Sequence, residues 1–156
     1  MRNVIVTGVA RADLGVVDQL AELGVATVHE AIGRAGYLGP GLRPIQEGVR
    51  TGGTAVTALC WPGDNLMIHA AVEQCQAGDV LVVTTTSPCT DGMFGELLAT
   101  SLAARGVRAL VIEAGVRGVE RVGRHRQRVV ACDDSRWNAD RAQDHRDRHA
   151  GPIDAG

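Results

Sequence analysis

The sequence of 156 residues predicts an α/β protein built on a parallel sheet. Two runs rich in apolar and β-branched residues, 80–85 and 109–112, are typical of strands buried on both faces. Between them, residues 94–105 carry apolar side chains at helical spacing, and Gly106 is expected to end that helix. A strand, a helix and a second strand in this order form a βαβ unit with parallel strands. The carboxyl ends of both strands then lie at one edge of the sheet, where ligands usually bind.

The amino-terminal part is expected to hold short elements. Residues 3–7, NVIVT, suit a short strand, and the apolar spacing within 14–23 suits an amphipathic helix. Thr27 and Glu30 match the T-x-x-E capping box of a second, short helix. Residues 37–53 are rich in Gly and Pro, which predicts a loop with one extended piece.

A further strand and helix are expected before the βαβ unit. Residues 54–59, TAVTAL, alternate and carry β-branched side chains, which favours a strand. The run 61–63, WPG, breaks it, and Asp64 is placed to cap the helix that follows. The apolar residues of that helix repeat at i, i+3, i+4 and i+7 and are expected to face the core. These residues are Ile68, Ala71, Val72 and Cys75.

Composition excludes several classes of function. The formal net charge of −2 gives no electrostatic reason for nucleic acid or a membrane surface as partner. No apolar run approaches the roughly 20 residues that span a bilayer, and the amino terminus lacks the pattern of a secretory signal. The four cysteines form no CxxC pair, so we expect reduced thiols and a cytoplasmic protein.

The chain contains no lysine, because all 16 of its basic residues are arginine. A mechanism through a Schiff base to a protein lysine is therefore excluded. A carbonyl substrate would have to be activated by a metal ion or by hydrogen bonds.

The functional site is expected within 92–118. This stretch is interpreted as a loop, a helix that begins at 95–98 (GELL), a strand and a loop that holds Arg117. Gly95 lets a ligand approach the backbone closely, and the N–H groups that follow it carry the positive end of the helix dipole. A carboxylate suits this position, and Arg117 could add a bidentate pair. The same residues also fit an ordinary helix start and a surface arginine.

Other polar residues admit two interpretations each. Glu96 could act as a general base or hold a water on a metal, or it could merely complement the helix dipole. Asp64 and Asn65 could contribute polar groups from an adjacent strand end, although simple helix capping explains them as well. His29 and His69 are more typical of structural histidines than of ligands.

The character of the chain changes after Gly118. Residues 119–156 hold eight of the 16 arginines and few apolar side chains, and 129–132 (VVAC) is the only run that suits a strand. This composition favours a solvated polar tail over a basic arm for nucleic acid, because aspartates offset the charge. His145 and His149 are spaced for one helix face, but no third metal ligand is evident.

Three segments closely resemble the class II pyruvate aldolases that cleave 4-hydroxy-4-methyl-2-oxoglutarate and 4-carboxy-4-hydroxy-2-oxoadipate. That family also includes the regulator of ribonuclease E activity called RraA. The segments are LGVATVHEAIGRAG (23–36), PGDNLMIHAAVEQCQAGDVLVV (62–83) and TSPCTDGMFGELLATSLAARGVRALVIEAGVR (86–117).

The resemblance implies an RraA-like swivelling β/β/α domain over 1–118, assembled as a homotrimer or homohexamer with sites between subunits. It implies Mg²⁺ or Mn²⁺ as cofactor and a small keto-acid as substrate. The implied reaction is retro-aldol cleavage that yields pyruvate, often with oxaloacetate decarboxylation as a side activity. The alternative is a non-catalytic protein-binding regulator similar to that of ribonuclease E.

Site residues follow from the resemblance by position. The pyruvate carboxylate is matched to the helix start, the substrate arginine to Arg117, and a polar residue near the pocket to Asn65. The residues of that helix start are Gly95, Glu96, Leu97 and Leu98.

The sequence departs from the family pattern in three respects. The family continues after the arginine with an Asp that binds the metal directly, whereas here Arg117 is followed by Gly118. A family lysine used in substrate binding has no counterpart. The tail from residue 119 matches no later part of the family, which suggests a truncation or a change of reading frame near residue 118. A search of the other two frames of the encoding DNA for a family-like continuation tests this hypothesis.

Overall fold

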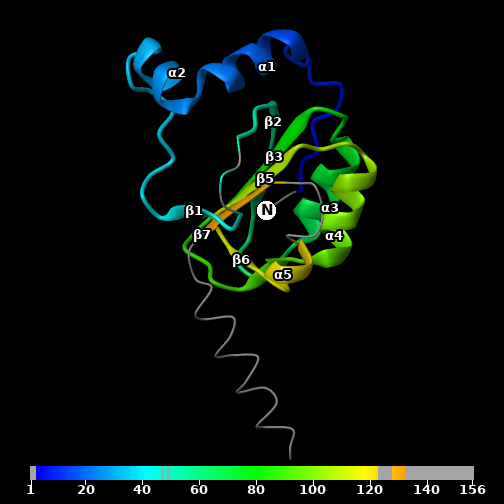
Figure 1. Cartoon of the computed structure of the whole chain (residues 1–156). Coiled ribbons are helices and arrows are strands. Elements are labelled where there is room, and N and C mark those ends of the chain that lie inside the picture. Colours follow the sequence, from blue (N-terminus) through cyan, green and yellow to red (C-terminus); the bar gives the residue numbers. More distant parts are fainter. Residues whose placement is uncertain (1–2, 47, 49, 123–127, 133–156) are drawn as a thin grey trace, which may run out of the picture.

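The computed structural model describes residues 3–46, 48, 50–122 and 128–132. A five-stranded sheet lies at its centre, in the order β1-β7-β5-β3-β2 (Figure 1). Helices α3 and α4 cover one side of this sheet, while α1 and α2 lie apart at one end of the molecule. The α/β class and the parallel sheet predicted from the sequence are confirmed.

The strands of the main sheet are β1 (Leu42–Pro44), β2 (Thr54–Cys60), β3 (Asp79–Thr85), β5 (Ala109–Ile112) and β7 (Arg128–Cys132). A second, two-stranded sheet pairs β4 (Gly92–Phe94) with β6 (Gly115–Val116). The helices are α1 (Leu14–Leu23), α2 (Val25–Ala31), α3 (Leu66–Gln74), α4 (Glu96–Ala104) and α5 (Val119–Val122). None of the helices in the described part of the chain is long and apolar enough to cross a membrane.

The predicted βαβ unit is present. Strands β3 and β5 are parallel, with Val80 opposite Ala109, and α4 connects them. Strand β2 pairs with β3 on the other side, also parallel, and β7 continues the parallel sheet beyond β5. Only β1 runs antiparallel, at the far edge beside β7. The run 129–132, expected to suit a strand, lies in β7, and the extended piece expected within 37–53 is β1.

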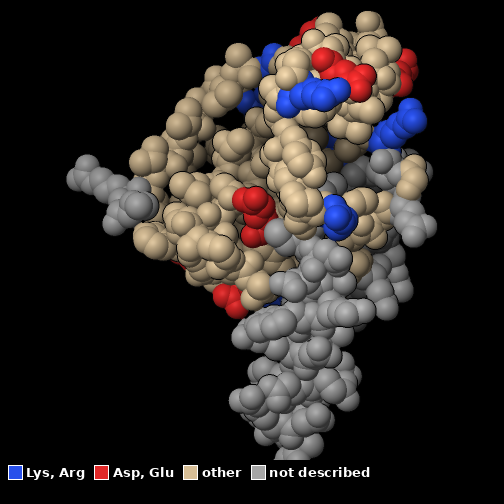
Figure 2. Space-filling model, turned by 90° about the vertical axis from the view of Figure 1, so that its left-hand side faces the viewer, with Lys and Arg blue, Asp and Glu red and all other residues tan. Residues whose placement is uncertain are grey.

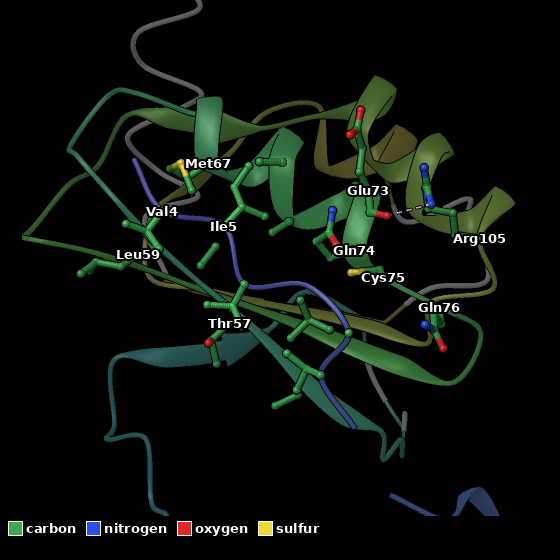
Figure 3. A pocket seen from close by; sticks show the side chains of 18 of the residues that line it. Val4, Ile5, Thr57, Leu59, Met67, Glu73, Gln74, Cys75, Gln76 and Arg105 are labelled. Atoms are coloured by element: carbon green, nitrogen blue, oxygen red, sulfur yellow. Dashed lines mark hydrogen bonds between the residues drawn. The ribbon is translucent and has the colours of Figure 1, made fainter. Parts of the chain in front are cut away.

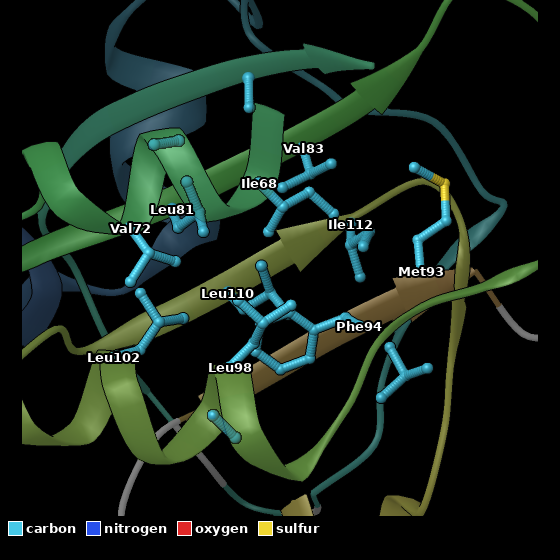
Figure 4. Close-up of a cluster of buried hydrophobic side chains, with 14 of the residues drawn as sticks. Ile68, Val72, Leu81, Val83, Met93, Phe94, Leu98, Leu102, Leu110 and Ile112 are labelled. Carbon is cyan, nitrogen blue, oxygen red and sulfur yellow. The ribbon is translucent and has the colours of Figure 1, made fainter. Parts of the chain in front are cut away.

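The hydrophobic core lies between the sheet and helices α3 and α4 (Figure 4). The four residues of α3 and its carboxyl end that were expected to face the core are all buried, as predicted. They pack with strand residues such as Leu81, Leu110 and Ile112, each no more than 1% exposed. Burial of this many aliphatic side chains, at roughly 25 cal/mol per Å², is the main stabilising contribution to the fold.

Helices α1 and α2 contribute no buried residue. Asp13 caps α1 through its side chain, which accepts a hydrogen bond from the N–H of Val16, and Gly24 ends the helix. Two arginines tie this region to the sheet. Arg11 binds the buried carboxylate of Asp79 at 2.9 Å, and Arg108 pairs with Asp18 on α1.

Two predictions in the amino-terminal half are wrong. Residues 3–7 form no strand, because no backbone ladder pairs them within the described residues. The capping box fails because α2 begins at Val25, directly after Gly24, so Thr27 already lies inside the helix. The prediction for Asp64 is confirmed in its chemistry: Asn65 occupies the formal capping position of α3, but the Asp64 carboxylate accepts the hydrogen bond from Leu66 N–H at 2.9 Å.

The predicted helix 94–105 is shorter than expected. Phe94 belongs to β4, because its carbonyl accepts a hydrogen bond from the N–H of Arg117 next to β6. Leu97 and Ser101 point to solvent, so the buried side of α4 consists of Leu98, Ala99 and Leu102 instead.

Strand β3 also departs from its prediction, because its burial alternates and only one face is fully covered. Cys60, Cys75 and Cys89 are free thiols, as expected. Of the segment 119–156, only 119–122 and 128–132 lie within the described residues; His145 and His149 lie outside them.

Candidate functional site

The candidate site lies at the carboxyl edge of the parallel sheet, where the small β4–β6 sheet joins two distant loops. Gly115 N–H donates to Asp91 O at 3.0 Å, and Arg117 N–H donates to Phe94 O at 2.8 Å. These bonds fix the loop after β5 against the start of α4. The sequence stretch 92–118 is thus folded so that its two ends meet, as its predicted βαβ topology requires.

The side chain of Arg117 lies across two glycines. A Cβ atom added at Gly92 would sit 2.3 Å from Cγ and 2.8 Å from Cδ of Arg117. A Cβ atom added at Gly95 would be 3.9 Å from Nε of the same arginine. The arginine stem therefore fills the space that a side chain at position 92 would need, and its head lies at the start of α4.

The amino end of α4 faces this arginine. The first bond of the helical ladder runs from Ala99 N–H to Gly95 O at 3.0 Å, so the N–H groups of Leu97 and Leu98 precede the ladder. Gly95 supplies no side chain to cap the helix. Orphan N–H groups, the positive end of a nine-residue helix and a guanidinium at one place favour a bound anion.

The other predicted site residues differ in their exposure and in their contacts. Asn65 is half-buried at the start of α3, and its side-chain amide donates to Met93 O at 3.3 Å, which links α3 to β4. Glu96 is exposed, Leu97 is 87% exposed and Leu98 is buried in the core. The structure therefore brings Gly95 and Arg117 together. Leu97 and Leu98 can contribute their backbone N–H groups at the start of α4.

Carboxylates at this edge do not form a metal cluster. Glu113 follows β5 and accepts a hydrogen bond from the hydroxyl of Thr84. Asp91 lies near Gly63, where an added Cβ would be 3.1 Å from its Oδ2 atom. Across the parts of the chain that the structure describes, no three His, Cys, Asp or Glu residues are grouped to hold a metal ion.

Gly118 is the position where the resemblance implies a metal-binding Asp. It is exposed, its φ is +65°, and an added Cβ would meet no atom within 4 Å. The residues present thus fit a carboxylate but do not fit a divalent metal as the family pattern would hold it. The space for a carboxylate side chain at position 118 is nevertheless open.

Gly92 and the β4–β6 sheet are the parts of the site that the sequence did not predict. Each of these strands has three residues or fewer, which is too short for any periodic pattern. The only available signal was the pair of glycines around Met93 and Phe94, which indicates a close backbone approach once the arginine is known to lie there.

The fold is that of an α/β protein, and the strand ends carry a candidate site for a small anion. A family model described as RraA-like, aldolase/RraA, matches residues 16–154. The chain belongs to this RraA-like aldolase family. The match includes most of the segment after Gly118, and the reading-frame hypothesis for that segment stays a prediction.

Individual relatives agree with this assignment. The chain is 22% identical over 110 residues to a protein of Halalkalibacterium halodurans named "Putative 4-hydroxy-4-methyl-2-oxoglutarate aldolase", covering 70% of this chain and 52% of that protein. The crystal structure of Streptomyces coelicolor RraAS2, from the RNase ES inhibitor RraA family, matches with a TM-score of 0.68 at 25% identity. It covers 80% of this chain and 65% of that one.

The RNA-processing inhibitor RraA of Thermus thermophilus shares the fold, with a TM-score of 0.59 at 19% identity. That match covers 68% of this chain and 64% of the other. The chain thus spans about half the length of the curated relative and less than two thirds of either solved structure.

Proposed function

We propose that this chain binds the carboxylate of a pyruvate-type keto-acid at the start of α4. The observation that carries the proposal is the position of Arg117, whose stem crosses Gly92 and whose head lies beside Gly95. A guanidinium and orphan helix N–H groups at the same end of α4 would offer a carboxylate charge-assisted hydrogen bonds. Membership of the aldolase/RraA family supports the choice of a keto-acid.

Each site residue then has a distinct part. The N–H groups of Leu97 and Leu98 would donate to one carboxylate oxygen, and Arg117 would bind the other oxygen or the neighbouring keto oxygen. Glu96 is an exposed acid in the first turn of α4 and would serve as the general base. Asn65 would keep β4 and α3 in register through its bond to Met93.

The reaction that fits such a site is retro-aldol cleavage of 4-hydroxy-4-methyl-2-oxoglutarate or 4-carboxy-4-hydroxy-2-oxoadipate. The 4-hydroxyl loses its proton to a base, the bond between C3 and C4 breaks, and the released pyruvate enolate takes up a proton. Decarboxylation of oxaloacetate would yield the same enolate. Mg²⁺ or Mn²⁺, which the family resemblance implies, would supply Lewis-acid chemistry, and we propose that Gly118 in place of a carboxylate weakens the hold on such a metal.

The variant Gly118→Asp tests the proposal. Asp tolerates a left-handed backbone better than most residues, and no atom blocks its side chain at this position. Mg²⁺-dependent pyruvate release from 4-carboxy-4-hydroxy-2-oxoadipate is expected to rise at least about tenfold over the unmodified chain. The matched control, Gly118→Asn, has the same shape without the charge and should not rise. Equal rates in all three proteins would refute the proposed role of position 118.

A second candidate function is a non-catalytic regulator that binds ribonuclease E. Two observations favour it: the missing carboxylate at position 118, and a fold shared with proteins that inhibit RNA processing. Purified chain and ribonuclease E should then form a complex in sedimentation or light scattering, and the nuclease rate should fall. Absence of a complex at high micromolar concentration would remove this candidate.

Self-assembly into a homotrimer or homohexamer belongs to the same proposal. The amino-terminal helices expose apolar side chains that a single copy leaves uncovered, among them Leu23, Val25 and Ile32, each more than half exposed. Light scattering after size exclusion measures the assembly, and a single copy at all concentrations would contradict it.

A further inference from the structure

A cavity of about 470 Å³ runs along the open edge of the main sheet, outside the candidate site (Figure 3). Five consecutive residues of the edge strand β2, 55–59, all line it. Successive strand residues point to opposite faces of a sheet, so five in a row can line one cavity only if it follows the edge of the strand. Helix α3 and the segment 4–9 form the other walls.

The edge of β2 presents backbone groups that no strand pairs. The carbonyl of Cys60 accepts a hydrogen bond from Thr86 N–H on the β3 side, so alternate residues of β2 face β3. Ala55, Thr57 and Leu59 must then direct their N–H and C=O groups outward, into the cavity. Among the described residues, the only bond recorded on that side is Ala12 N–H to the hydroxyl of Thr54, at 3.0 Å. An open edge of this kind is a template for an added strand.

The chain itself contains a segment suited to that edge. Residues 3–9, NVIVTGV, are uncharged and mostly β-branched, a composition that strongly favours strands. Yet the segment forms no strand in the structure, and its Val4, Ile5 and Val6 side chains are 70%, 53% and 68% exposed. We call residues 3–9 the amino-terminal strap.

The strap of the same copy is held as a wall of the cavity. Arg11, just after it, binds Asp79 and donates to Gln74 O at 2.9 Å, and its Nη1 atom also donates to Val9 O. Gly8, near the end of the strap, has a φ of +68°, so the chain bends there. The edge of β2 therefore faces a cavity that the copy's own strap lines without pairing to the strand.

We propose that this cavity is a strand-docking site for the amino-terminal strap of a second copy of the chain. The incoming strap would take the place of the copy's own strap, which goes to the next copy. It would pair with the outward groups of β2 and bury its valine and isoleucine side chains against Met67 and Ala70. Donation of a strap from each copy to the next is a head-to-tail contact, and such contacts form a ring where the rotation between copies closes. The inference rests on the self-assembly proposed above and names the surface that carries it.

Hydrogen exchange of the full chain at increasing protein concentration tests the proposal. The backbone amides of Ala55, Thr57 and Leu59 should exchange more slowly as the assembly forms, because new backbone hydrogen bonds to the incoming strap protect them. A concentration-independent exchange of 54–60 would overturn the proposal, since it would mean that the edge stays open or is covered by the copy's own strap.

Two variants at one position separate strand pairing from side-chain effects. Ile5→Pro removes a backbone donor and should abolish the concentration-dependent protection, with a shift to smaller assemblies. Ile5→Thr keeps the donor and the β-branched shape and should behave like the unmodified chain. Ile5 is more than half exposed, so neither change disturbs the core. If Ile5→Pro assembles and stays protected at 54–60, the strap proposal fails while the self-assembly proposal stands.

Discussion

The amino-terminal region, residues 3–44, and the central region that follows it differ in how they are held. The central region holds the buried core between the sheet, α3 and α4, whereas α1 and α2 contribute no buried residue. Figure 2 shows charged side chains gathered at the end of the molecule that holds α1 and α2, above a face that is largely uncharged. The central region is thus stabilised by its own packing, whereas the segment that holds α1 and α2 is tied to the sheet by polar contacts such as Arg11–Asp79 and Arg108–Asp18 and leaves apolar side chains exposed.

The largest expected effect comes from a substitution in the packed core of the central region. Leu102→Ala removes a side chain that is 1% exposed between α4 and the sheet, and should lower the free energy of unfolding by about 3 kcal/mol. Leu20→Ala on α1, where the side chain is 45% exposed, should cost less than about 1 kcal/mol. Urea unfolding of both variants measures the difference. Equal losses would show that α1 is packed as tightly as the core.

The second effect concerns the contacts that hold the amino-terminal region. Arg11→Met leaves the carboxylate of Asp79, whose side chain is 2% exposed, without its charged partner. We expect a loss of about 3 kcal/mol, because an unpaired buried charge is costly.

Arg108→Met is the matched control. Its partner Asp18 is about half exposed, so the loss should stay below about 1 kcal/mol. Thermal unfolding of the two variants compares their stability. A larger loss of stability in Arg108→Met would mean that Arg108, and not Arg11, makes the more important contact.

A third effect arises where the two regions meet, at Cys75. Burial raises the pKa of this thiol to about 11, and the nearby Asp79 carboxylate adds to the increase. A raised folded-state pKa contributes stability that is complete below the ordinary thiol pKa and is lost as the pH rises toward 11. Between about pH 8.5 and 11 we expect the free energy of unfolding to fall by about 2 kcal/mol more in the unmodified chain than in Cys75→Ala. Parallel pH profiles would contradict this.

The smallest expected effect compares two glycines. Gly92→Ala puts a methyl group where the stem of Arg117 lies, so the arginine must move and keto-acid affinity should fall about tenfold. Gly41→Ala in the amino-terminal region meets nothing within 4 Å and should leave affinity unchanged. Calorimetric titration with pyruvate measures both variants. An unchanged affinity in Gly92→Ala would show that the position of the stem is not critical.

The same two regions differ in how far the sequence predicts them. The runs 80–85 and 109–112 and the apolar positions of α3 identify the central region correctly, because burial imposes a strict period on those residues. The predictions for 3–7 and for Thr27 are wrong. They rest on local propensity alone, and few side chains of that region are constrained by packing within one copy.

The candidate site is predictable in part for a related reason. The convergence of Gly95 with Arg117 follows from the βαβ order alone, since parallel strands bring their carboxyl ends together. The position of Gly92 does not follow, because the contact depends on a three-residue strand and on the rotamer of one arginine. The roles of Glu96 and Asn65 stay predictions, as neither placement selects one chemistry.

The central claim is that Arg117 and the start of α4 together hold a keto-acid carboxylate. Calorimetric titration of pyruvate into the full chain and into Arg117→Gln, without added metal, tests it most directly. We expect saturable binding to the unmodified chain and an affinity at least about tenfold weaker in Arg117→Gln, since a charge-assisted hydrogen bond is worth about 1.5–3 kcal/mol. Equal affinity in the two proteins, or no binding to either, would contradict the account.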